Sequence, residues 1–161
     1  MLKTYHGSCH CGAVLFEAAL DLTQSTYRCN CSICRRTRFW PAVAREDGFR
    51  LLAGEPELTQ YLFNTRKNQH YFCRQCGVRA FGIGTETPIG KMYGVNLGCL
   101  NDVSDEELSQ APVTYVDGRS DRWHSAPEFF DHLEGARHER AGSRRRGKGP
   151  SSRARLGRTV C

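Results

Sequence analysis

Seven of the nine cysteines in this chain lie within residues 9–76, in three short clusters. Thiolate sulfur is a preferred zinc ligand; structural zinc is closed by four protein ligands, whereas catalytic zinc keeps three and leaves one position open. We therefore predict two zinc ions per chain, one at a closed site and one at an open site where the function lies. The four-cysteine site comprises Cys9, Cys11, Cys73 and Cys76, and the three-cysteine site comprises Cys29, Cys31 and Cys34.

The four-cysteine site would connect two distant parts of the chain. Gly7 and Gly12 lie on either side of its first cysteine pair, and Gly77 follows the second pair. Glycine allows the tight turns that bring two thiolates onto one ion. Such a staple suits a domain whose hydrophobic fraction is only 39%, because zinc binding contributes directly to folding free energy. The alternative is a set of buried or redox-active thiols.

The three-cysteine site spans six residues, so one loop can bind one ion. Its fourth position is predicted to hold water or substrate, and the protein groups that could fill it instead are Cys99, His70 and His10. We expect both histidines to lie beside the metal ligands or at the surface. Cys99 follows a predicted strand and is expected to be a buried apolar thiol. A fourth protein ligand would argue against catalysis.

An open, thiolate-rich zinc ion favours soft ligands, and a substrate thiol is one of them. Metal coordination converts a thiol into the nucleophilic thiolate. Arg35, Arg36 and Arg38 directly follow the three-cysteine site and could bind the carboxylates of an anionic substrate, or could be solvated surface. Phe39 and Trp40 come next and are expected in the core, with a pocket wall as the alternative.

Cysteine-rich short chains are often secreted disulfide scaffolds, but three features favour metal here. The cysteine count is odd, the pairs are closely spaced, and Met1–Tyr5 leads into the first cluster without an apolar segment typical of a signal peptide. No apolar run approaches the ~18 residues of a membrane span. We expect a soluble, cytoplasmic protein with no membrane contact.

Charge divides the chain into two parts. The net charge is +6, but residues 136–161 hold nine Lys/Arg and a single acid, Glu139, which leaves residues 1–135 at −2. The tail has almost no apolar residues and is predicted to be disordered. We predict a zinc-binding domain over residues 1–135 and a basic tail over 136–161. Nucleic acid is an unlikely partner, reachable only through the tail, whose Lys/Arg would release counterions from phosphate.

Short apolar runs and sixteen glycines predict a mostly β domain with one or two short helices. Ser104 and Glu107 form a capping box that starts a helix, and Pro112 ends it. A second short helix is expected within residues 123–133, through residues 127–130. The strand at 49–52 is expected to form a hairpin with that at 58–63. The other predicted strands are 2–5, 13–20, 26–28, 70–72, 80–84 and 91–97.

Four stretches, GSCHCGAVLFE, CNCSICRR, HYFCRQCGVRAFG and VNLGCLND, resemble the GFA family, named for glutathione-dependent formaldehyde-activating enzyme and including the centromere protein V domain. The resemblance covers roughly residues 5–133. It implies a β-tent fold of paired hairpins around zinc, with structural zinc at the four-cysteine site and catalytic zinc at Cys29, Cys31 and Cys34. The bulky run Arg38-Phe39-Trp40-Pro41 replaces a small, Gly-containing stretch, and the basic tail lies outside the family pattern.

The activity implied by the resemblance is that of a carbon–sulfur lyase acting in reverse. Glutathione, or a similar small thiol, and an aldehyde would give an S-hydroxymethylglutathione-like adduct. Two other hypotheses stay open from the residues alone. One is a non-catalytic zinc module whose tail binds nucleic acid or another polyanion, and the other is a thiol redox protein that uses its CxxC pairs without metal.

Overall fold

The computed structural model describes residues 1–134, which form ten strands, two α-helices and four 3-10 turns. The strands are β1 (Lys3–Ser8), β2 (Leu15–Leu20), β3 (Thr26–Cys29), β4 (Pro41–Arg45), β5 (Phe49–Ala53), β6 (Leu58–Tyr61), β7 (Asn68–Cys73), β8 (Arg79–Gly84), β9 (Met92–Asn96) and β10 (Val113–Val116). The helices are α1 (Ser32–Thr37) and α2 (Asp105–Gln110), and the 3-10 turns are η1 (Glu46–Gly48), η2 (Glu55–Glu57), η3 (Leu97–Cys99) and η4 (Asp131–Leu133). The predicted mostly β class with two short helices is confirmed, whereas the predicted disordered tail at 136–161 lies outside the described residues.

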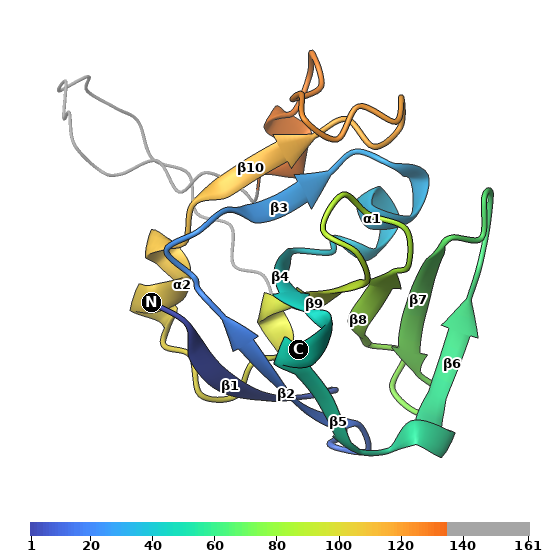
Figure 1. The fold of residues 1–161 in the computed structure, drawn as a ribbon, viewed down its shortest axis with the longest axis vertical. Helices are drawn as coiled ribbons and strands as arrows, with labels where there is room; N and C mark the ends of the chain where they lie inside the picture. The colour runs from blue at the N-terminus through green and yellow to red at the C-terminus, as the bar shows by residue number, and fades with distance from the viewer. Residues whose placement is uncertain (135–161) are drawn as a thin grey trace, which may run out of the picture.

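The strands form three sheets (Figure 1). An antiparallel sheet of three has the order β1-β2-β5, and an antiparallel sheet of five has the order β4-β9-β8-β7-β6. The third is a parallel pair, in which β10 lies along β3 although some ninety residues separate them in the chain. Neither helix of the part that the structure describes is long and apolar enough to cross a membrane.

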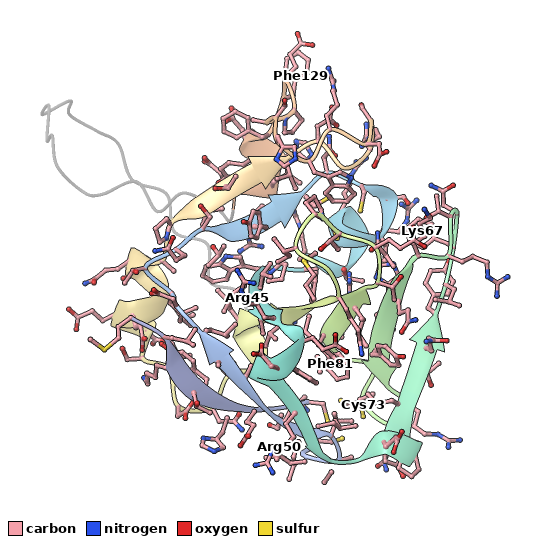
Figure 2. The ribbon with its side chains drawn as sticks, in the orientation of Figure 1. Arg45, Arg50, Lys67, Cys73, Phe81 and Phe129 are labelled. Carbon is pink, nitrogen blue, oxygen red and sulfur yellow. The ribbon has the colours of Figure 1, made fainter. Side chains whose placement is uncertain are left out.

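Aromatic side chains join the two larger sheets. Phe16 and Phe49 of the three-stranded sheet stack with ring centroids 5.6 Å apart, and Phe49 stacks on Tyr93 of the five-stranded sheet at 4.2 Å. The buried Phe81 contacts all three of these rings, with centroid distances of 4.8 Å to Phe49 and 6.3 Å to both Phe16 and Tyr93 (Figure 2). Burying each such side chain is worth about 1.5–3 kcal/mol. The alternation predicted for residues 13–20 places Phe16, Ala18 and Leu20 in this core.

The predicted hairpin between residues 49–52 and 58–63 is wrong. β5 pairs with β2, and β6 pairs with β7 at the edge of the other sheet. Gly54, at φ 86°, turns the chain into η2 and so carries it from one sheet to the other. The reason is burial: Phe49 faces Phe16 and Phe81 in the core, whereas the strand β6 is largely exposed.

Two helix predictions need revision in detail. Ser104 caps α2 by accepting a hydrogen bond from the Glu107 amide at 3.1 Å, as predicted. The Glu107 carboxylate does not reach back to the cap, because it accepts a hydrogen bond from the Tyr5 hydroxyl and pairs with Lys3. The α-helix expected within residues 123–133 does not form: residues 127–130 are not helical, and this range holds the single 3-10 turn η4 at Asp131–Leu133.

Candidate metal centres

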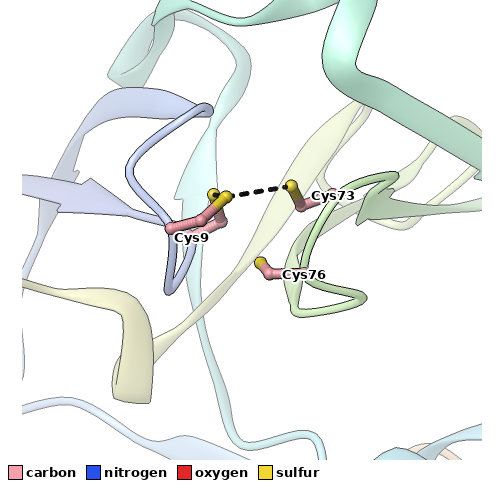
Figure 3. Close-up of side chains that lie close together, drawn as sticks. Cys9, Cys73 and Cys76 are labelled. Atoms are coloured by element: carbon pink, nitrogen blue, oxygen red, sulfur yellow. Dashed lines mark hydrogen bonds between the residues drawn. The ribbon is translucent and has the colours of Figure 1, made fainter.

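Two hairpin turns bring the four-cysteine site together (Figure 3). Cys9 and Cys11 lie in the turn between β1 and β2, whereas Cys73 is the last residue of β7 and Cys76 lies in the turn between β7 and β8. The glycine after each pair adopts positive φ, 78° at residue 12 and 74° at residue 77. All four sulfurs lie within 4.8 Å of one another. The structure therefore brings together the four cysteines that were predicted to form the closed site.

The spacing of these sulfurs fits an ion rather than disulfide bonds. Sγ of Cys11 is 3.5 Å from that of Cys9 and 3.7 Å from that of Cys73. A tetrahedron with zinc–sulfur bonds of about 2.3 Å has sulfur–sulfur edges of about 3.8 Å, whereas a disulfide bond measures about 2.05 Å. Backbone amides support negative sulfur here: Val14 N–H donates to Cys9 Sγ at 3.3 Å, and the Val78 amide lowers the pKa of Cys76 to about 6.

The three-cysteine site forms where β3 meets α1. Cys29 ends β3, Cys31 is the N-cap of α1, and Cys34 lies in the first helical turn. Their sulfurs also lie within 4.8 Å of one another. The Cys31 amide donates to Cys29 Sγ at 3.3 Å. The Cys29 and Cys34 thiols, followed by the first amides of α1, lower the pKa of Cys31 to about 2, so this loop favours thiolate.

Within residues 1–134, the three-cysteine site has no fourth ligand: no histidine, carboxylate or further cysteine lies with its three sulfurs. Cys99 is buried in the core, as expected, and burial raises its pKa to about 11. His10 is exposed in the β1–β2 turn. His70 is buried, with Nδ1 2.7 Å from the Arg79 guanidinium. Among the described residues, these three sulfurs therefore have no fourth histidine, cysteine or carboxylate ligand.

Arg79 also lies at this site, although cysteine spacing did not indicate it. It is only 7% exposed, and its Nη1 lies 3.8 Å from Cys34 Sγ. Its guanidinium lies 3.5 Å from the centre of the Phe39 ring. Burial lowers the pKa of Arg79, and the nearby thiols oppose that shift. The available signal is an arginine at the start of a strand whose residues are otherwise small or apolar.

The loop at 117–123 forms one wall of the three-cysteine site. Asn30, between two of the cysteines, donates to the buried Asp117 carboxylate at 2.6 Å and accepts from the Arg119 amide at 2.9 Å. Gly118 then passes so close that an added Cβ would lie 2.5 Å from Cys29 Sγ and 2.9 Å from Trp123. Only glycine fits at this position without displacing the sulfur.

A small cavity of about 10 Å³ opens beside two of the cysteines, near the lower limit for one water molecule. Two of the three arginines predicted to bind anions already donate to backbone carbonyls: Arg36 to Ser32 and Arg38 to His132. The third, Arg35, makes no side-chain hydrogen bond to the described residues. Phe39 is buried, as expected, and also lines the cavity. The lining comprises Arg28, Cys29, Cys34, Arg35, Arg38, Phe39 and Leu133.

Trp40, also expected in the core, is half-buried. Its indole N–H donates to Thr26 Oγ1 at 2.8 Å, and the Arg28 guanidinium lies 4.8 Å from its ring centre. The bulky run after the three-cysteine site therefore supports the cavity wall. The Trp40 ring packs against the Arg28 guanidinium, and the Phe39 ring packs against the Arg79 guanidinium.

Comparisons with known proteins agree with this arrangement. A solved structure of a Rhodobacter sphaeroides protein from a structural genomics programme is similar, with a TM-score of 0.59 and 38% identity over 68% of this chain and 99% of that one. The family model described as glutathione-dependent formaldehyde-activating enzyme matches residues 4–117. The resemblance seen in the sequence is thus confirmed: this chain belongs to the GFA family, the family of the glutathione-dependent formaldehyde-activating enzyme.

Proposed function

We propose that this protein is a zinc-dependent carbon–sulfur lyase-type enzyme that joins glutathione, or a similar small thiol, to formaldehyde or another aldehyde. The observation that carries the proposal is the three-cysteine site: three converging sulfurs, no fourth ligand within residues 1–134, and a cavity that reaches two of them. Family membership supports the same chemistry.

The donor sets fit two zinc ions with different roles. Cys9, Cys11, Cys73 and Cys76 would hold a structural ion. The three sulfurs of Cys29, Cys31 and Cys34 would hold a second ion, which when bound supplies a Lewis acid that favours the thiolate form of a substrate thiol.

The chain's own residues would bind and orient the substrates. Arg28 and Arg35 lie at the cavity and can receive a carboxylate of glutathione. Phe39 and Leu133 are both buried and line the same cavity. In the reaction the thiol sulfur bonds to the aldehyde carbon, the carbonyl electron pair moves to oxygen, and that oxygen takes up a proton to replace the one the thiol lost.

The variant Cys31→Ser tests the proposal, with Cys99→Ser as the matched change outside both sites. We expect Cys31→Ser to stay folded, to bind one zinc ion per chain instead of two, and to lose activity. Cys99→Ser should keep both ions and full activity. Because thiol and aldehyde also combine unaided, the measurement is the exchange rate between free and adduct formaldehyde by NMR. Unchanged metal content and exchange rate in Cys31→Ser would remove the proposal.

A further inference from the structure

Arg79 carries a buried positive charge without a carboxylate partner in residues 1–134. Its side chain is 7% exposed, and none of the ion pairs in this part of the chain includes it. The one buried carboxylate among residues 1–134, Asp117, already pairs with Arg122 at 2.7 Å. A buried charge is costly unless an opposite charge lies close by. The nearest candidate is Cys34 Sγ, 3.8 Å from Arg79 Nη1.

The surroundings fix the position of this guanidinium. One face lies on the Phe39 ring at 3.5 Å. Nη2 lies 2.7 Å from His70 Nδ1, and because arginine only donates, His70 accepts there as a neutral ring. Gly82 leaves the necessary space, since an added Cβ would lie 2.9 Å from Nη2. The Arg79 carbonyl accepts from Asn96 at 2.8 Å, which anchors the backbone.

We propose that Arg79 is the fixed counterion of the three-cysteine site and the residue that allows this site to accept an anionic thiolate. Three thiolates and a divalent ion carry −1, which Arg79 brings to zero. Binding of a substrate thiolate then changes the local net charge from zero to −1. Without Arg79, the net charge would become −2. The role of Arg79 in binding a substrate thiolate rests on the proposed function, whereas its role as a counterion to the three cysteines does not.

The test compares Arg79→Gln, which removes the charge, with Arg79→Lys, which keeps it, in full-length protein. Chelator competition with Co²⁺ gives the metal affinity of each site from its thiolate absorption bands. Glutathione and neutral imidazole are then titrated into the Co²⁺ form. We expect Arg79→Gln to weaken metal at the three-cysteine site by about 10- to 100-fold, the range for residues that support metal ligands. Glutathione binding should weaken more than imidazole binding, and Arg79→Lys should recover most of both losses.

The outcomes separate this inference from a purely structural role. Equal metal affinity in Arg79→Gln and the native protein would overturn it, as would equal losses in the Gln and Lys variants or equal losses for glutathione and imidazole. If Arg79→Gln fails to fold, Arg79→Lys must still fold and keep metal within about 10-fold of the native protein, or the inference fails. If the Gln variant weakens metal but even the native protein binds no glutathione, the counterion role stands and the proposed function fails.

Discussion

Cys29 and Cys31 are two residues apart, yet their neighbours shift the pKa values of the two thiols in opposite directions. Hydrogen bonds with the Cys31 and Cys34 thiols raise the pKa of Cys29, whereas the pKa of Cys31 falls to about 2. Arg79 adds a fixed positive charge beside the third sulfur. A divalent ion at this site would be bound by thiolates, so metal binding is expected to release protons.

At the residue scale, Gly118→Ala should damage the three-cysteine site selectively. The added methyl group would lie 2.5 Å from Cys29 Sγ and against Trp123, so the sulfur or the loop must move, at a cost of about 1–3 kcal/mol. We expect the variant to bind one zinc ion per chain and to lose activity. Metal analysis and the NMR exchange assay measure both effects.

The matched control for this change is Gly48→Ala. There an added Cβ would meet its nearest atom at 3.5 Å, an ordinary contact, and both ions should be retained. Two zinc ions in Gly118→Ala would show that the loop at 117–123 does not form a fixed wall of the site.

Individual residues differed in how far the sequence could reveal them. Cysteine spacing indicated both candidate sets of metal ligands, because cysteines that bind one ion often lie two or three residues apart in the sequence. Arg79 and Gly118 could not be found in that way, since what distinguishes them is a distance to Cys34 and Cys29 across the fold. Such proximity depends on sheet pairing, which local pattern does not encode.

At the element scale, local patterns indicated strands more reliably than their partners. β1, β2, β7, β8 and β9 were all expected near their observed positions. β4, β10 and α1 were missed: Pro41–Arg45 lacks strong alternation, Val113–Val116 is stabilised by a distant parallel partner, and Ser32–Thr37 is too short for a helical period. α1 matters most, because its first turn carries Cys34.

The turns β1–β2 and β7–β8 are held together at the four-cysteine site, so Cys76→Ser should impair folding itself. Binding of structural zinc is worth about 10–16 kcal/mol in small peptides, comparable with the whole ~5–15 kcal/mol stability of a domain. We expect a much lower unfolding midpoint for Cys76→Ser than for Cys31→Ser. Thermal unfolding followed by circular dichroism measures this difference, and a strong chelator should bring the native protein toward the same unfolded signal. Equal midpoints in the two variants would mean that the closed site is not a staple.

At the scale of the whole molecule, the last described residues complete the wall of the cavity beside the three-cysteine site. Leu133 is buried and lines the cavity beside Cys29 and Cys34, and the His132 carbonyl accepts from Arg38 at 2.6 Å. The family match ends at residue 117, before this segment. We therefore propose that the domain extends to about residue 135 and that the basic tail at 136–161 is not needed for metal binding or catalysis.

Two truncated chains test this boundary. The chain 1–135 should bind two zinc ions and match the full-length protein in the exchange assay. The chain 1–126 loses Leu133 and the carbonyl that holds Arg38, so water gains access to the cavity and we expect weaker metal at the three-cysteine site with the four-cysteine site intact. Loss of either ion in the chain 1–135 would contradict the boundary. DNA binding at low salt by the full-length protein, absent from the chain 1–135, would instead support the polyanion-binding hypothesis for the tail, because counterion release makes such binding strongly salt-dependent.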